Sequence, residues 1–496
     1  MSKQDKWLKE FNIQKEDPLK FLSDMKTCFC KVCEKSFIAI QKSQIAQHVK
    51  SEKHTKNSML KKKRTATQAQ LEDLTERNSH KRSRQDIITK ELCEALLVTD
   101  IPWRKLVPKF RSFLETHVGI QMPSESHLRK NQLHECYEDV ISKIRDDLDG
   151  EPIWVGVDET TDSTGRFVAH VMVGKLKADQ YHRPYLLDCV FLDHVNSSTI
   201  SRFVNDSLRR MWSVFKCENF KILISDAAAY MVKSGKELKV FYPNLLHLTC
   251  FAHAVHRVCE QVREMFPIVN DLISTVKKVF LKAPSRILIW KENCSLSLPP
   301  QPILTRWGTW IQAAIFYAQN FDEIKEVVSK LNSDEALSIK RSKETMENES
   351  LQCNLAFIAC NLSFLPDLLT QLEKQGLTLK ESFDLIDRVK TKIDEIPGNN
   401  GRILKDKFVA VMKRNPDVEK LRSICEVQEG NMQMFPSGEL SPYDVACLRY
   451  CPTVNVDVER SFSIYKNVLT DRRQTLTTEN IAKIMVTHCF YNRDTC

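Results

Sequence analysis

The sequence predicts a mixed α/β protein, in which a small metal-binding head and a helical segment precede a sheet covered by helices, and a long helical region follows it. Short apolar runs rich in β-branched residues lie between residues 151 and 262, a pattern typical of strands. Apolar residues recur at three- and four-residue steps over 85–150 and 263–440, which indicates helices. Closely spaced cysteines and histidines lie within residues 1–56.

The strands are expected in four runs between 151 and 262. The first three, WVGVDETTD, RFVAHVMVGKL and YLLDCVFLDHV, follow in quick succession, which predicts an antiparallel meander. A helical stretch, STISRFVNDSLRRMWSVFK, then leads into the fourth run, FKILISDAA. Strands mixed with helices in this way predict a mixed sheet covered by helices.

The positive charge is concentrated at the head of the chain. Residues 1–84 contain 20 Lys or Arg and 10 Asp or Glu, and the remaining residues contain 53 and 54. A basic head on a neutral body indicates a nucleic-acid binder, because contacts with phosphates release counterions. A solvated, flexible arm is the alternative interpretation of such a charge run.

The chain is expected to act in the nucleus. Residues 57–84 form a polar basic linker with the clusters KKKR at 61–64 and KRSR at 81–84, which are typical of nuclear-import signals. The first twenty residues are too polar for a secretory signal. No run approaches the roughly 18 to 20 apolar residues that span a membrane. The cysteines are accordingly expected to be reduced core residues and metal ligands.

The head predicts a structural zinc site. Two residues separate Cys30 from Cys33, and five residues separate His48 from His54. Fourteen residues lie between the cysteine pair and the histidine pair. Two thiolates and two imidazoles are the donors that tetrahedral zinc prefers. The cysteine pair suits a turn between strands, and the histidine pair suits successive turns of one helix. Cys28 is a nearby alternative to Cys30.

Lysines in and beside the expected helix of the head would face DNA phosphates. Lys50, Lys53 and Lys56 lie in the segment that carries the two histidines. Because zinc fingers also bind proteins, DNA as the ligand is inferred from this charge.

Two acids lie at the ends of apolar runs. Asp158 ends the first run and Asp226 ends the run ILISD. Acids at the ends of neighbouring strands can converge, and hard carboxylate oxygens select magnesium or manganese. Alternatively, an Asp in this position caps a helix or forms a turn. Glu159 and Asp162 compete with Asp158 for the role.

Three further strings resemble motifs of the hAT superfamily of DNA transposases. TCFAH at 249–253 resembles the motif after the second catalytic acid, and LTRWGTW at 304–310 resembles the Arg-Trp motif of the helical insertion. VDVERSFSIY at 456–465 resembles the C-terminal dimerisation signature around the third acid. The head resembles zinc fingers of hAT-derived proteins related to the CGG-triplet-repeat-binding protein.

The resemblance implies a ribonuclease H-like core that is interrupted by a helical insertion. Carried over by motif, the catalytic triad is Asp158, Asp226 and Glu459, which would hold two magnesium or manganese ions. Asp457 would face elsewhere on the same helix. The core would then comprise 151–262 and the end of the chain, 441–496, which would also carry the dimerisation region. The helical segment 85–150 would assist dimerisation or DNA binding.

The resemblance also implies residues that contact DNA. Trp307 would stack on an unstacked base beside Arg306, because an indole offers a large π-face; a packing aromatic is the alternative. His253 would contact DNA or orient an acid, and Cys250 would pack in the core. A buried histidine with a structural role is the other interpretation of His253.

Two functions follow from the resemblance. The first is an active transposase that binds double-stranded DNA as a homodimer or larger assembly and cuts and joins transposon ends. The second is a domesticated nuclear DNA-binding regulator that keeps the finger and the dimerisation tail without the chemistry. Apolar residues in SFSIYKNV and IAKIMV are expected to supply the dimer surface.

Overall fold

The computed structural model divides the chain into two compact units, Met1–Thr89 and Lys90–Cys496. A mixed α/β architecture with mostly helical content is present, as the sequence predicted. The structure describes the following residues: 19–21, 27–30, 32–33, 35–38, 41–59, 84–119, 121–212, 215–303, 308–434, 440–469 and 476–493.

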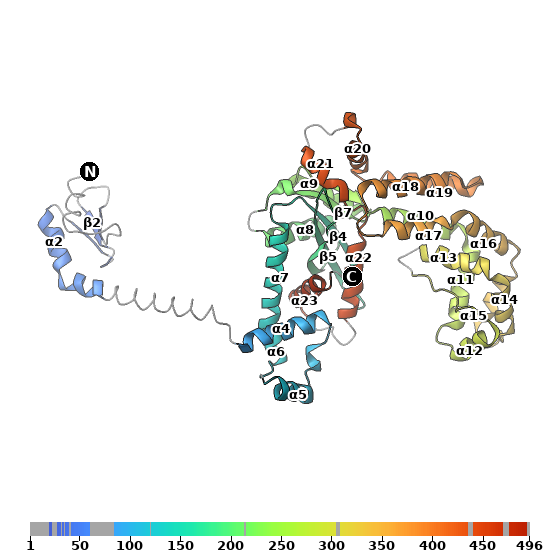
Figure 1. Cartoon of the computed structure of the whole chain (residues 1–496), viewed down its shortest axis with the longest axis horizontal. Coiled ribbons are helices and arrows are strands. Elements are labelled where there is room, and N and C mark those ends of the chain that lie inside the picture. The colour runs from blue at the N-terminus through green and yellow to red at the C-terminus, as the bar shows by residue number, and fades with distance from the viewer. Residues whose placement is uncertain are drawn as a thin grey trace. The chain divides into compact units, whose positions relative to one another are not determined.

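The head is a three-stranded antiparallel sheet followed by a helix (Figure 1). Its elements are β1 (Leu19–Phe21), β2 (Thr27–Cys30), β3 (Lys35–Ile38) and α2 (Lys42–Lys50). Residues 52–59 are helical again, so the helical part of the head runs past the predicted boundary at residue 56. Ile45 is fully buried and supplies apolar contact beneath α2.

The second unit contains a five-stranded sheet with the order β6-β5-β4-β7-β8. The first three strands pair antiparallel, which confirms the predicted meander. β7 and β8 run parallel to β4. The strands are β4 (Ile153–Thr161), β5 (Phe167–Lys175), β6 (Tyr185–Leu192), β7 (Phe220–Ser225) and β8 (Leu246–Thr249).

Helices cover both faces of this sheet. Successive side chains of a strand point to opposite faces, so each strand contributes to two cores. In β4, Val155 and Val157 pack in a core with residues of α8 (Ser197–Met211) and α9 (Ala229–Phe241). Trp154 packs in a second core with residues of α10 (Phe251–Met265). A buried sheet of this kind explains why its strands are continuous apolar runs.

Helices precede the sheet, as predicted for 85–150. Ser124 caps one of them by accepting a hydrogen bond from the His127 main-chain nitrogen. The helical elements are α4 (Arg84–Val98), η1 (Trp103–Lys105), α5 (Pro108–Val118), α6 (Glu125–His127), the π-helical turn η2 (Leu128–Gln132) and α7 (Leu133–Leu148), with η3 (Cys217–Asn219) before β7.

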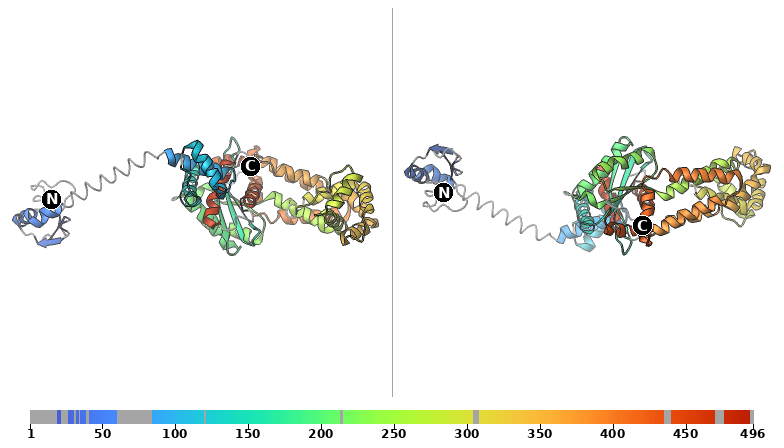
Figure 2. Two further views of the ribbon diagram at one scale, coloured as in Figure 1. Left: turned by 90° about the horizontal axis from the view of Figure 1, so that it is seen from below. Right: turned by 90° about the horizontal axis from the view of Figure 1, so that it is seen from above.

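The helical insertion extends from the sheet edge (Figure 2). α10, α17, α18 and α19 form a stalk that leads to a bundle of α11 to α16. α10 crosses the predicted boundary at residue 262. The remaining helices are α11 (Pro267–Phe280), α12 (Pro284–Asn293), α13 (Gly308–Gln319), α14 (Phe321–Lys330), α15 (Leu337–Met346), α16 (Glu349–Leu362), α17 (Phe364–Leu372), α18 (Leu379–Asp394), α19 (Gly398–Met412), α20 (Val418–Gln428) and η4 (Met432–Met434).

The end of the chain returns to the sheet. It contains α21 (Pro442–Cys447), η5 (Leu448–Tyr450), α22 (Val456–Val468) and α23 (Thr478–Tyr491). α22 packs on β4 and β5, and α23 packs on β6 and α7. Phe462, Tyr465, Ile481 and Met485 are buried in this core. The apolar residues expected at a dimer surface are therefore used inside the chain, because these amphipathic helices cover the sheet.

None of the described helices alone is long and apolar enough to cross a bilayer. One bent pair, Glu349–Leu362 with Phe364–Leu372, would suffice by length and composition only.

Candidate metal centres

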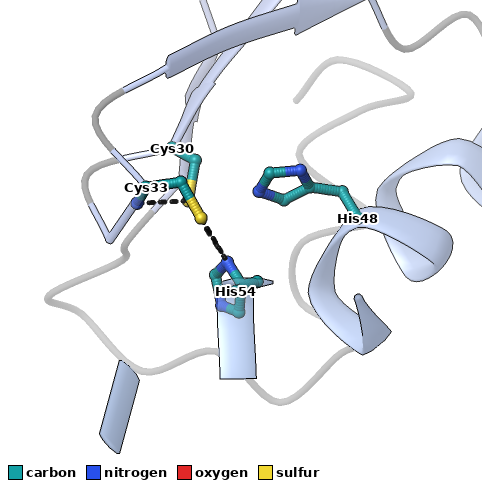
Figure 3. A group of neighbouring side chains, drawn as sticks. All are labelled: Cys30, Cys33, His48 and His54. Carbon is teal, nitrogen blue, oxygen red and sulfur yellow. Dashed lines mark hydrogen bonds between the residues drawn. The ribbon is translucent and has the colours of Figure 1, made fainter. Parts of the chain in front are cut away.

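The four predicted zinc ligands meet in the head (Figure 3). One donor atom from each of Cys30, Cys33, His48 and His54 lies within 4.8 Å of all the others. The two sulfurs lie 3.3 and 3.5 Å from Nδ1 of His54. Zinc bonds of about 2.0–2.3 Å in a tetrahedron separate neighbouring ligand atoms by roughly 3.3–3.8 Å, so these side chains fit a structural zinc ion.

The two histidines do not lie on successive turns of one helix, which corrects the sequence expectation. α2 ends at Lys50, and Ser51 has an extended conformation with φ −65° and ψ 141°. The Ser51 hydroxyl donates to the main-chain oxygen of His48 and accepts from the His54 main-chain nitrogen. This break accommodates the five-residue spacing, because it lets a second helical segment present His54 beside the first.

The environment of the cluster favours neutral imidazoles. Burial lowers the pKa of both His48 and His54, which keeps their nitrogen lone pairs available to a metal. Burial and the neighbouring Cys30 raise the pKa of the Cys33 thiol, and a bound dication would offset that rise. The side chain of Cys28 lies outside the described residues. Lys50, Lys53 and Lys56 are exposed on the helical segments, as a phosphate-facing role requires.

Asp158 lies within β4, and Asp226 directly follows the adjacent parallel strand β7. In the register of β4 with β7, Gly156 pairs with Ile224. Two further residues along each strand bring Asp158 level with Asp226, and neighbouring strands are about 4.8 Å apart. One Asp226 oxygen accepts a hydrogen bond from the Ala228 main-chain nitrogen at 3.0 Å, so Asp226 also caps the turn into α9.

Glu459 approaches β4 from the first turn of α22. The buried Asn455, at the N-cap of that helix, donates from Nδ2 to the main-chain oxygen of Val157 at 3.0 Å. Such close approach requires Gly156, because a Cβ there would lie 2.5 Å from Asn455 Oδ1. The N-terminus of α22 is thereby held directly on β4, one residue before Asp158.

His253 connects the acids across the site. Its Nε2 lies 3.5 Å from Oε1 of Glu459. Burial lowers the pKa of this imidazole, yet Cys250 and two nearby carboxylates raise it to about 10. Burial also raises the pKa of Asp158 to about 8, the imidazole opposes this rise, and the carboxylate of Asp226 adds to it.

The three acids lie near one another, but their carboxylate oxygens do not gather around a single point. Within the described ranges, no group of three carboxylates has its oxygens within 4.8 Å of one another. The three acids therefore lie near one another where β4 and β7 adjoin the start of α22, less tightly gathered than the ligands of the head.

The competing acids have other partners. Asp162 accepts hydrogen bonds from Thr164 and Arg166 in the turn after β4. Although burial opposes it, these bonds lower the Asp162 pKa. Asp457 accepts hydrogen bonds from Gln375 and Arg460, away from Glu459.

Glu159 faces the other side of the sheet from Asp158, because the two are consecutive in β4. It accepts a hydrogen bond from the Tyr230 hydroxyl at the start of α9. Burial raises the pKa of the Glu159 carboxyl, and the nearby Asp226 carboxylate raises it further.

Cys250 directly precedes α10, and His256 lies on that helix. Cys250 is buried, and its sulfur accepts a hydrogen bond from the Asn455 main-chain nitrogen at 3.2 Å. His256 lies 3.6 Å from a Glu373 oxygen. Arg306 and Trp307 lie outside the described residues. The next residue, Gly308, begins α13, where a Cβ would lie 4.0 Å from the His256 ring.

Sequence reasoning missed several buried polar residues that surround the acids. His170 and His247 are almost fully buried in β5 and β8, and each is hydrogen-bonded to a serine close to one of the acids. The available signal was a histidine inside an otherwise apolar strand, in FVAHVMVGK and LHLT.

Fold and geometry together define a mixed α/β protein with a Cys/His cluster that could bind zinc. Residues 123–279 match the family described as Domain of unknown function (DUF659), a domain found in hAT-type and plant transposase-like proteins. The match includes Asp158, Asp226 and His253, and it ends before Glu459. No curated protein matches the chain.

Proposed function

We propose that this chain is a DNA transposase of the hAT type, which cleaves and joins DNA strands at transposon ends. The observation that carries the proposal is the proximity of Asp158 and Asp226 on neighbouring parallel strands, with Glu459 on the helix that packs against β4. The parallel register supports the pairing of the two aspartates, and the Asn455 contact with β4 supports the approach of Glu459.

The strand arrangement supports a ribonuclease H-like core. An antiparallel meander is followed by two strands parallel to the first, in the order β6-β5-β4-β7-β8. A helix from the end of the chain, α22, packs on β4 and β5 after the long insertion. Both features agree with a core of 151–262 completed by 441–496.

The acids would hold two magnesium or manganese ions, because carboxylate oxygens are the ligands these ions prefer. Such ions, when bound, activate a water and stabilise the leaving oxygen in phosphodiester cleavage. The charged His253 balances the carboxylates and would orient Glu459.

The head and the insertion would contact double-stranded DNA in the nucleus. Zinc would hold the finger, and Lys50, Lys53 and Lys56 would contact phosphates. Trp307 would stack on an extruded base, with Arg306 beside it. The chain would act as a homodimer or larger assembly, through a surface other than the buried faces of α22 and α23.

A cleavage assay tests the proposal. The zinc-loaded protein is incubated with labelled terminal-repeat duplexes and magnesium, beside Asp226→Ala and the matched control Asp149→Ala. Asp149 is exposed before β4, at the opposite end of that strand. We expect nicks or hairpins with the wild type and the control but none with Asp226→Ala. Cleavage that persists in Asp226→Ala would contradict the proposal.

The exposed lysines of the head favour a second candidate, a domesticated nuclear DNA-binding regulator. Tight duplex binding without metal-dependent cleavage, across many candidate ends, would support this alternative.

A further inference from the structure

We infer that two buried histidine–serine pairs, His247 with Ser225 and His170 with Ser461, are positioning residues that hold the main-chain segments carrying the three acids. This inference rests on the proposed function, because it assigns the pairs to the same cation site. Neither pair touches a reacting atom; each acts through the backbone beside an acid.

The first pair fixes Asp226. The Ser225 hydroxyl donates to the main-chain oxygen of Asp226 at 2.8 Å. His247 Nε2 lies 2.8 Å from the same hydroxyl. Since the hydroxyl has one proton and gives it to the carbonyl, the imidazole N–H must be the donor to the serine. The chain of bonds therefore runs from His247 through Ser225 to Asp226.

The second pair repeats this arrangement at Glu459. The Ser461 hydroxyl donates to the main-chain oxygen of Val458 at 2.6 Å. His170 Nδ1 lies 2.7 Å from that hydroxyl, so His170 donates to Ser461 by the same reasoning. His170 is also the cross-strand partner of Asp158. This pair therefore ties the strand next to Asp158 to the helical turn that carries Glu459.

Both pairs are shielded from water. His170 and Ser225 are 0% exposed, His247 is 1% and Ser461 is 2% exposed. A buried donor that loses its partner has no water to replace it, which makes such bonds costly to break. Burial lowers the pKa of His170 to about 3 and that of His247 to about 4, so both rings are neutral single donors.

The surrounding packing fixes the two rings. A Cβ on Gly235 would lie 2.1 Å from His247 Nδ1, so α9 packs directly against that ring. The His247 main-chain nitrogen donates to Asp417 at 2.7 Å, which connects it to the segment after α19. The centroid of the His170 ring lies 4.3 Å from that of Phe462. Each ring thus has one position from which to hold its serine.

Divalent-cation affinity tests the inference. Mn²⁺ binding to the zinc-loaded full chain is measured by calorimetry, with Asp226→Ala defining binding outside the site. We expect Ser225→Ala and Ser461→Ala to bind roughly tenfold more weakly or worse, as is usual when residues that orient ligands are changed. Ser234→Ala is the matched control, because buried Ser234 donates to the Met231 oxygen on α9 and has no such bond to an acid-bearing segment.

Conservative replacements separate positioning from packing. His247→Gln and His170→Asn keep a donor near the original nitrogen, whereas His247→Leu and His170→Leu remove it. We expect the amide variants to bind Mn²⁺ more tightly than the leucine variants. Equal Mn²⁺ affinity in the wild type, Ser225→Ala and Ser461→Ala would overturn the inference alone. Equal affinity in the wild type and Asp226→Ala would overturn the proposed function, and this inference with it.

Discussion

The His253 imidazole lies 3.5 Å from the Glu459 carboxylate, and this contact joins the helix after β8 to the helix that closes the sheet near the end of the chain. His253 also interacts with Asp158. A single cationic ring therefore balances acids that come from two distant parts of the sequence.

Replacement of His253 should destabilise the metal-free protein more than the metal-bound protein. We expect His253→Gln to lower the free energy of unfolding by about 1 kcal/mol, a partly exposed ion pair's usual contribution. The folded pKa of about 10 exceeds the ordinary histidine pKa of 6.5, so the stability difference between wild type and variant is full below pH 6.5 and is lost as the pH rises through 10. Urea titrations with and without Mn²⁺ measure it. If Mn²⁺ leaves the stability difference between wild type and His253→Gln unchanged, His253 does not balance the charge of the acids.

Cation affinity should rise with pH between about 6 and 9. The pKa of Asp158 is raised to about 8, so its proton competes with the cation at neutral pH and is lost as the pH rises. Mn²⁺ titrations at several pH values measure the slope. Asp158→Asn, which has no such proton, should bind weakly with a flatter profile, and an unchanged slope in that variant would refute the assignment.

An added methyl group at Gly156 should displace α22. In Gly156→Ala the new Cβ would lie 2.5 Å from Asn455 Oδ1, and overpacking of this kind costs about 1–3 kcal/mol. We expect reduced stability in urea titrations and weaker Mn²⁺ binding. The double variant Gly156→Ala with Asn455→Ala removes the clash and should lose less stability than the two single effects added together. Strict additivity would show that the two residues do not interact.

Zinc should bind to the head with one ion per chain. Cys30→Ser should abolish this zinc, because the four ligand atoms lie within 4.8 Å of one another, whereas Cys28→Ser should retain it. Elemental analysis of the purified chains measures the stoichiometry. The reverse result would assign the site to Cys28.

Local patterns predicted four of the five strands of the sheet, the meander and the zinc ligands, because these depend on periodicity and spacing, whereas the short strand β8 was missed. Asp158 and Asp226 could be proposed as neighbours because both end apolar runs, whereas Glu459 depended on family resemblance. The contact of Asn455 with Gly156 could not be predicted, since it joins two distant segments. The same holds for the histidine–serine pairs. The helix break at Ser51 was missed because the spacing of the histidines alone does not locate it.

Anomalous scattering from Mn²⁺ in crystals of the zinc-loaded protein with a DNA end would show whether the three acids hold divalent cations. We expect manganese peaks within about 2.0–2.4 Å of carboxylate oxygens of Asp158, Asp226 and Glu459, in the range typical of hard cations. Fully occupied zinc in the head with no manganese at these three acids would contradict it.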